Sequence, residues 1–145
     1  MKQIVIDASV VLKWYLVDEE YSQKALGLLD KYISNELGIL APSLLKYEVI
    51  NGLIIAKKRG RIQENKILTA IDGFISLELK LINISLFYPK VLHYCKLFYR
   101  SAYDASYLAL ADKNNIPLVT ADKSLYNAVK KDLKWVKWLG DYVLF

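Results

Sequence analysis

The chain has 145 residues, with 20 Lys and Arg against 15 Asp and Glu and a formal net charge of +5. This length suits one domain with a single hydrophobic core, and we expect one continuous domain over residues 1–145. A hydrophobic content of 54% excludes an intrinsically disordered chain. No stretch reaches about 18 uninterrupted apolar residues, which excludes a membrane-spanning helix. The basic surplus favours a polyanionic partner, with nucleic acid the first candidate.

The cysteine and histidine counts restrict the metal chemistry. The chain has one cysteine, Cys95, and one histidine, His93. A single cysteine cannot form an internal disulfide, which fits the reducing cytoplasm where we expect the protein to reside. Zinc sites built from several cysteines or histidines are excluded. Any metal must therefore have oxygen ligands, as Mg²⁺ or Mn²⁺ prefer.

The first half of the chain begins with an apolar, β-branched run at residues 3–7 (QIVID), which predicts a buried strand. Ser9 then begins a helical stretch, and a second helix is expected over about residues 19–34. A short strand is predicted at residues 38–41. Pro42 favours the first turn of the next helix, which we expect to run to about residue 58 and stop at Gly60.

The second half continues this alternation of helices and strands. Helices are expected at residues 63–72, 88–99, 101–113 and 123–129. Strands are expected at residues 79–84, 117–120 and 135–139. The pattern predicts an α/β fold with three layers, helices on both sides of a central, mainly parallel sheet. Ligands of such sheets bind beyond the carboxyl ends of the strands, where Asp7 and Asp122 are expected.

Four acidic residues are candidates for a site, although each has a structural alternative. Asp7 and Asp122 precede helices and could cap them, and Asp104 with Ser101 resembles a capping box. Glu48 could be a solvated charge. However, it stands in an apolar segment (LLKYEVINGLII) close to the core side of its helix, where an unpaired charge is costly. The local patterns leave open whether the four acids meet in space.

If the four acids do meet, they need compensation. Two like charges at about 4 Å repel by about 1–4 kcal/mol, depending on the local dielectric. The cluster therefore requires one or two divalent cations, or raised pKa values. Asn51 lies one helical turn from Glu48 on the same side, and we expect it to orient Glu48 or to contact the ligand.

The chain resembles PIN-domain ribonucleases, of the kind found as the VapC toxin of VapBC toxin–antitoxin pairs. Four motifs carry the resemblance, and their order and spacing agree over nearly the whole chain. They are DAS at residues 7–9, Glu48 in PSLLKYEVINGL, YDA at residues 103–105 and TAD at residues 120–122. The resemblance implies a PIN-like α/β/α domain with its acids clustered at one end of the sheet.

The resemblance also implies roles for the four acids. Asp7 and Asp104 match direct metal ligands, Glu48 matches the third acidic position, and Asp122 matches a fourth that often acts through water. The implied activity is that of an endoribonuclease with a carboxylate-held Mg²⁺ or Mn²⁺ as cofactor. Such hydrolysis is expected to leave a 5′-phosphate and a 3′-hydroxyl.

Ser9 and Thr120 match small hydroxyl residues beside such a site. The implied partners are an RNA substrate, a cognate antitoxin protein and a second copy of the chain in a homodimer. The apolar segments SQKALGLLDKYI and LLKYEVINGLIIA are expected to form a groove for an amphipathic segment of the antitoxin.

Other functions stay open as alternatives. The chain could be a PIN nuclease of RNA processing that is not a toxin, or a non-catalytic RNA-binding or interaction module. A small Mg²⁺-dependent phosphatase is disfavoured, because Ser9 stands where those with an aspartyl nucleophile carry a second acid. A nucleotide-binding domain is disfavoured because no G-x-G-x-x-G motif or P-loop follows the first strand.

Basic and aromatic residues outside the motifs could contact RNA. The densest basic cluster is the run at residues 57–61 (KKRGR), which is also typical of a helix end. Lys13, Lys123, Lys130 and Lys131 are comparable or weaker candidates. The tyrosines and tryptophans could stack on bases, but most of them are expected to pack, Trp135 and Trp138 included.

Overall fold

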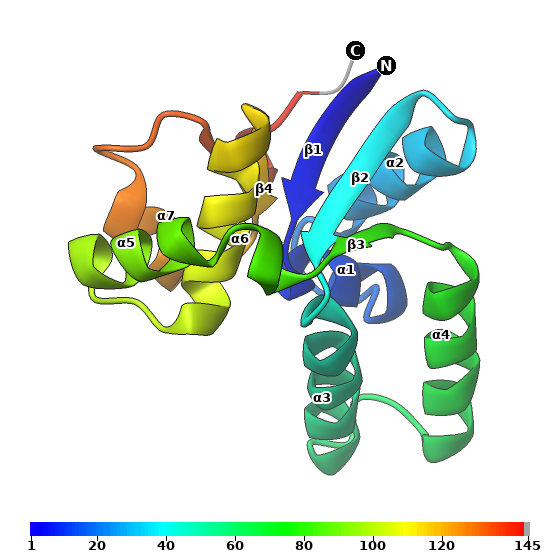
Figure 1. Ribbon diagram of the computed structural model, residues 1–145. Helices are drawn as coiled ribbons and strands as arrows, with labels where there is room; N and C mark the ends of the chain where they lie inside the picture. The colour runs from blue at the N-terminus through cyan, green and yellow to red at the C-terminus, as the bar shows by residue number, and fades with distance from the viewer. Residues whose placement is uncertain (144–145) are drawn as a thin grey trace.

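Five parallel strands form one sheet in the order β3-β2-β1-β4-β5 in the computed structural model (Figure 1). The structure describes residues 1–143, so the last two residues of the predicted domain lie outside the described part. The strands are β1 (Lys2–Ile6), β2 (Leu37–Pro42), β3 (Lys80–Ile82), β4 (Leu118–Thr120) and β5 (Val136–Trp138). The predicted parallel sheet is confirmed.

Helices cover both faces of this sheet, which confirms the three-layer α/β/α architecture. Helices α1 and α2 lie on one side, and α6, with α5 packed against it, lies on the other (Figure 1). Helices α3 and α4 project as an arm beyond the carboxyl ends of the strands. The helices are α1 (Ala8–Tyr15), α2 (Ser22–Ile33), α3 (Leu45–Lys58), α4 (Glu64–Ser76), α5 (Tyr88–Phe98), α6 (Ala102–Asn114) and α7 (Lys123–Val129). Two short 3₁₀ turns occupy Ile84–Leu86 and Leu139–Asp141.

The core lies where β1, β2 and β4 meet the helices of both faces. All of β2 and β4 is buried, as are the last three residues of β1. Strands covered on both faces have apolar side chains at successive positions, which is why their segments are continuous apolar runs in the sequence. Helix α6 is buried from Ala105 to Ala111, and its three alanines in this stretch let it approach the sheet closely.

Two local predictions are wrong. Pro42 does not begin a helix; it ends β2 opposite Ile82, and α3 starts only at Leu45. Proline is tolerated at this strand end because the ladder bond to the Ile82 carbonyl is donated by the Ser43 amide, at 2.9 Å. Helix α4 continues past Asp72 to Ser76, since buried Phe74 anchors its last turn.

The predicted groove between α2 and α3 is also wrong, because α1 packs against both of these helices. The packing of α1 on α3 is close at Gly52, one turn after Glu48. A Cβ atom added to Gly52 would lie 2.5 Å from Leu12 Cδ1. This contact sets the distance between α3, which carries Glu48, and α1, which follows Asp7.

The sheet order reverses between β1 and β4, which are neighbours although the chain visits β2 and β3 between them. Such a topological switch point opens a crevice at the carboxyl ends of the two strands. Asp7 directly follows β1, and Asp122 lies two residues after β4. The topology therefore brings both acids to this crevice.

Replacing Gly52 by Ala tests the α1–α3 contact against a matched helical glycine. Gly73→Ala in α4 meets no atom within 4 Å, so it should raise the free energy of unfolding by about 0.5–1 kcal/mol. Gly52→Ala should instead lower it by about 1 kcal/mol through overpacking against Leu12. Urea unfolding of both variants measures the difference. An equal gain in both would show that the contact is not tight.

Candidate active site

Each of the four predicted acids lies at the N-terminal end of a helix. Asp7 and Asp122 occupy the N-cap positions of α1 and α7, and Glu48 and Asp104 lie in the first turns of α3 and α6. The positive end of a helix dipole stabilises a carboxylate at such a position. These four helix ends thus favour the placement of negative charge near the switch point.

Asp7 is 6% exposed and is held by two hydroxyl groups. Ser9 Oγ donates to its Oδ1, and Thr120 Oγ1 donates to its Oδ2 at 2.5 Å. Both hydroxyl oxygens are themselves acceptors: Ala121 N donates to Ser9 Oγ at 2.9 Å, and Asp122 N donates to Thr120 Oγ1 at 3.0 Å. The backbone amides after β4 therefore direct both hydroxyl protons onto Asp7.

The pKa of Asp7 is raised to about 6. Burial is the main cause, while the hydrogen bonds from Ser9 and Thr120 act in the opposite direction. The negative charges of Asp122 and Glu48 add to the increase, so these acids lie within electrostatic range of Asp7. In the absence of a cation, burial and the two neighbouring acids therefore disfavour the ionised form of Asp7.

Glu48 is half-buried and takes its hydrogen bond from a residue that the sequence did not reveal. Tyr107 Oη, on α6, donates to Glu48 Oε1 at 2.5 Å. Burial raises the pKa of Glu48, the Tyr107 hydrogen bond opposes this, and the charges of Asp104 and Asp122 add to it. Burial and the nearby Glu48 charge raise the pKa of Tyr107 far above neutrality, so Tyr107 remains the proton donor.

Asn51 does not orient Glu48 as predicted. Within residues 1–143, no hydrogen bond joins the two side chains, and Asn51 is exposed. Both residues line a cavity of about 560 Å³ between α3 and the start of α6, with Tyr47 and Tyr103 at its sides. Asn51 is therefore placed to contact a ligand in this cavity rather than to hold Glu48.

Asp104 forms an ion pair with Arg100, a second residue that the sequence did not reveal. Arg100 Nε and Nη2 donate to Asp104 Oδ2 at 3.0 and 2.7 Å, and Nη1 donates to Ser124 Oγ at 3.2 Å. Only half of the predicted capping box forms: Ser101 Oγ accepts from the Asp104 amide, while the Asp104 carboxylate turns to Arg100. The spacing of four residues between Arg100 and Asp104 is the feature of the sequence from which this ion pair could have been predicted.

Asp122 is a helix cap as well as a member of the cluster. Its Oδ1 accepts from the Leu125 amide at 3.1 Å, which confirms the predicted capping of α7. By contrast, the Asp7 side chain makes no hydrogen bond to the first backbone amides of α1, so its carboxylate does not cap the helix.

The carboxylate oxygens of the four acids are the kind of ligand that a hard divalent cation prefers. Asp7 is a buried carboxylate whose pKa is raised by burial and by two neighbouring acids, as expected where a cation would restore the balance. Among the described residues, however, no three His, Cys, Asp or Glu side chains are grouped tightly enough to enclose an ion as they stand. Arg100 supplies the positive charge on Asp104, and a metal there would have to share or displace it.

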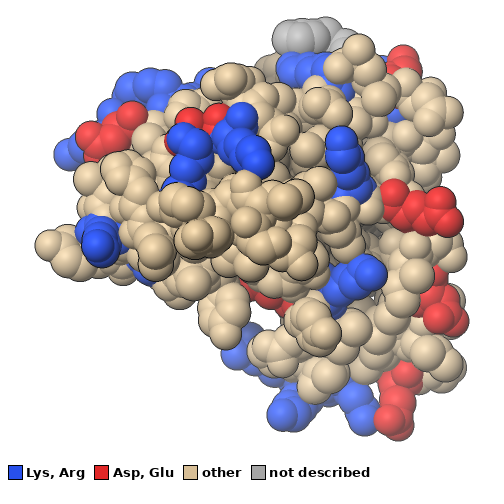
Figure 2. All heavy atoms as spheres, in the orientation of Figure 1, with Lys and Arg blue, Asp and Glu red and all other residues tan. Residues whose placement is uncertain are grey.

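One face of the molecule has a recess. In Figure 2 the molecule is hollowed between the lobe that carries α5 and the arm that carries α3, and acidic atoms are visible inside this hollow. Uncharged atoms cover most of the surface around it on this face. A recess of this shape can admit an extended ligand.

The fold and the site together define an α/β domain with a cluster of carboxylates at the switch point of a parallel sheet. The chain matches the PIN domain family over residues 4–131, most of its length, and it belongs to that family. PIN domains are generally nucleases that act on RNA and use divalent metal ions. The predicted family is therefore confirmed.

A solved structure supports the same fold. The chain is similar to the crystal structure of PAE2754 from Pyrobaculum aerophilum, with 22% sequence identity and a TM-score of 0.67 over 96% of this chain and 92% of that one. A search of curated proteins gave no significant match. Within residues 1–143, every helix is too short or too polar to span a bilayer.

Replacing Asp7 by Asn should stabilise the metal-free protein. In EDTA at about pH 7.5, we expect Asp7→Asn to raise the free energy of unfolding by about 1–3 kcal/mol, because the folded state no longer holds a buried charge. The gain should shrink as the pH falls through about 6, since folded Asp7 then takes up a proton that the unfolded chain binds only near pH 4. Thermal unfolding measures both effects.

Asp112→Asn is the control for this prediction. Asp112 accepts hydrogen bonds from Tyr94 and Lys90, and these outweigh the effect of burial and lower its pKa. Its replacement should therefore destabilise the protein by about 1 kcal/mol. Destabilisation by Asp7→Asn of similar size would mean that Asp7 is a structural residue.

Proposed function

We propose that this chain is a metal-dependent endoribonuclease that hydrolyses RNA phosphodiester bonds. The observation that carries the proposal is Asp7, a buried carboxylate that makes no side-chain cap hydrogen bond to α1 and whose pKa is raised mainly by burial and further by two other acids. Such a charge lowers the stability of the fold, whereas a site that binds a cation and acts on a phosphate makes use of it.

The four acids would divide the work of holding the cation. Asp7 and Asp104 would hold Mg²⁺ or Mn²⁺ directly, Glu48 would complete the set or orient the attacking water, and Asp122 would act through water. When bound, the cation lowers the pKa of a water molecule and neutralises charge on the phosphate. Water attack on phosphorus breaks the bond to the 3′-oxygen, which takes up a proton and leaves as a 3′-hydroxyl beside a 5′-phosphate.

The neighbouring residues would fix the geometry of this chemistry. Ser9 and Thr120 each hold one oxygen of Asp7, so the carboxylate cannot rotate. Tyr107 holds Oε1 of Glu48, which leaves Oε2 to accept a hydrogen bond from the attacking water. Rigid positioning of this kind accounts for a large share of enzymatic rate acceleration.

We further propose that the protein is a VapC-type toxin that acts as a homodimer in the cytoplasm and is inhibited by an antitoxin. The toxin role rests on the motif resemblance to VapC. A homodimer is supported by exposed apolar side chains on α3 and α5, among them Tyr47, Ile54, Leu92 and Leu97. A groove of about 940 Å³ between the end of α1 and the α3–α4 arm could accept an antitoxin segment.

Cleavage assays with the purified protein test the nuclease proposal. A panel of single-stranded and structured RNAs should be cut with Mn²⁺ or Mg²⁺ and left intact in EDTA. Asp7→Asn and Asp104→Asn should each reduce cleavage by about 1,000-fold or more, with circular dichroism unchanged. Products should accept 3′-end ligation and resist 5′-phosphorylation until dephosphorylated. Full cleavage in EDTA, or by both variants, would refute the mechanism.

Tyr107→Phe tests the positioning of Glu48. Loss of the hydroxyl should lower the cleavage rate by about 10–100-fold while RNA affinity stays unchanged, since only the orientation of Glu48 is affected. Tyr94→Phe is the matched control, because Tyr94 also donates to a carboxylate, Asp112, but outside the acidic cluster. Equal losses in the two variants would point to a general effect on folding.

The toxin proposal is tested in cells and in solution. Induced expression of the wild-type chain should arrest growth and that of Asp7→Asn should not, and light scattering should give the mass of a dimer. Growth without arrest, with RNA cleavage intact in vitro, would assign the protein to RNA processing instead.

A further inference from the structure

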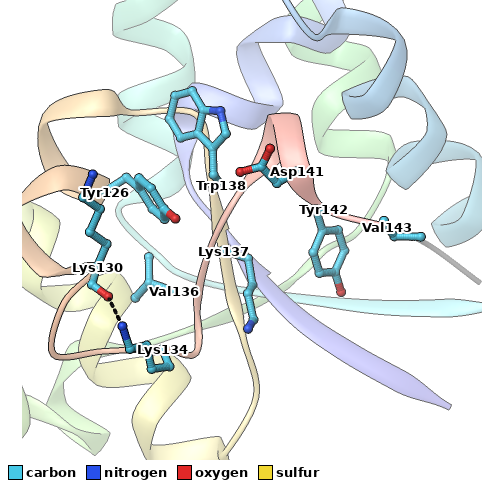
Figure 3. Close-up of a pocket in the computed structure, with 9 residues that line it drawn as sticks. All are labelled: Tyr126, Lys130, Lys134, Val136, Lys137, Trp138, Asp141, Tyr142 and Val143. Atoms are coloured by element: carbon cyan, nitrogen blue, oxygen red, sulfur yellow. Dashed lines mark hydrogen bonds between the residues drawn. The ribbon is translucent and has the colours of Figure 1, made fainter.

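A second pocket, whose lining contains none of the four acids, lies on the open side of the edge strand β5. It has a volume of about 360 Å³. Figure 3 shows its residues around a common space, with Tyr126 of α7 on one side, Lys137 of β5 in the middle and Tyr142 on the other side. The lining combines three lysines with three aromatic residues: Lys130, Lys134, Lys137, Tyr126, Trp138 and Tyr142. We call these six residues the β5 pocket.

The β5 pocket is strongly basic. Its three lysines face a single carboxylate, that of Asp141, which leaves a local charge of +2. In the described part of the chain, none of the three lysines forms an ion pair with an acid. Lys134 Nζ donates to the Lys130 carbonyl at 3.4 Å, and Lys130 Nζ lies 5.8 Å from the centre of the Tyr126 ring. Unpaired lysines held close together attract a polyanion.

The aromatic residues of the pocket offer ring surfaces and an unused hydroxyl. The Tyr126 and Trp138 rings lie 5.5 Å apart, centre to centre, at an angle of 43°. Tyr142 Oη is buried and finds no hydrogen-bond partner within residues 1–143. A buried polar atom without a partner is uncommon and points to a ligand that would supply one.

Two structural links join the β5 pocket to the acidic cluster. Along α7, Asp122, Tyr126 and Lys130 follow one another at intervals of four residues, hence on one side of the helix. Across the sheet, Trp138 pairs in register with Thr120, the residue that donates to Asp7. Neighbouring strands lie about 4.8 Å apart, so Trp138 of the pocket lies one strand away from the residue that donates to Asp7.

We propose that the β5 pocket binds single-stranded RNA next to the bond that is cut, an inference that rests on the proposed nuclease function. Lys134 and Lys137 hold phosphates, and a base stacks on Tyr126 or Trp138. Cationic side chains interleaved with aromatic rings are the combination that binds single strands without sequence preference. Four carboxylates repel the RNA backbone, so the affinity has to come from a neighbouring surface of opposite charge.

Salt-dependent binding of a short, fluorescein-labelled single-stranded RNA tests this proposal. The measurement uses the Asp7→Asn protein in EDTA, so that no RNA is cut. Adding Lys134→Gln and Lys137→Gln should weaken binding about tenfold at moderate salt and reduce the slope of log K against log[salt] by about 1.4, or about 0.7 per phosphate contact. The control pair, Lys66→Gln with Lys80→Gln, removes equal charge from α4 and the opposite sheet edge.

Unchanged affinity and slope in the Lys134→Gln, Lys137→Gln protein would overturn the proposal, and so would an equal effect of the control pair. Photocrosslinking locates the bases independently: RNA containing 4-thiouridine should crosslink to Tyr126, Trp138 or Tyr142. Crosslinks confined to Tyr47 and Tyr103 would place the strand in the other cavity and also overturn it.

Cleavage by the chain with Asp7 intact separates this inference from the nuclease proposal. If that chain cuts no RNA but RNA binding still depends on Lys134 and Lys137, the β5 pocket is an RNA-binding site and the nuclease proposal fails. If RNA is cut but binding is insensitive to these lysines, the inference alone fails.

Discussion

The arrangement of the site depends on one constraint, the repulsion between negative charges near the switch point of the sheet. The acids lie at the N-terminal ends of four helices, and their negative charges act on one another. Like charges that are brought together in this way cost stability unless they are compensated. The chain offsets part of this cost with donors: two hydroxyls on Asp7, a phenol on Glu48, a guanidinium on Asp104 and a backbone amide on Asp122. The pKa values of Asp7 and Glu48 are still raised, mainly by burial and further by the charges of the neighbouring acids.

This arrangement separates two tasks that conflict in a nuclease. Chemistry on a phosphodiester calls for carboxylates that can hold a cation, whereas binding of the same polyanion calls for positive charge. In this chain Asp7 and Asp122 follow β1 and β4, and lysines gather at the neighbouring edge strand β5. Helix α7 spans both regions, with Asp122 at its start and Lys130 just past its end.

The sequence predicts the order of strands and helices well, because strands buried on both faces have apolar side chains at successive positions. It also places the four acids, since each follows a strand or opens a helix. The motif resemblance also indicates Ser9 and Thr120 as hydroxyl residues beside the site, and both donate to Asp7. The sequence does not reveal Tyr107, which reaches Glu48 across 59 residues, a contact that only the tertiary fold determines. Pro42 shows that tertiary pairing can also override a local pattern. The proline predicts the start of a helix, but the pairing of β2 with β3 keeps it in a strand.

The central position of β1 has a consequence for the time at which this site forms. β1 precedes both of its partner strands, β2 and β4, in the chain, and one of the two hydroxyls that hold Asp7 comes from Thr120. A growing chain on the ribosome therefore carries Asp7 and Glu48 long before the segment that orients them has been synthesised. Non-local pairing of this kind is also slow to form. The acidic site therefore cannot reach its final geometry before the segment that carries Thr120 has been added and β4 has paired with β1.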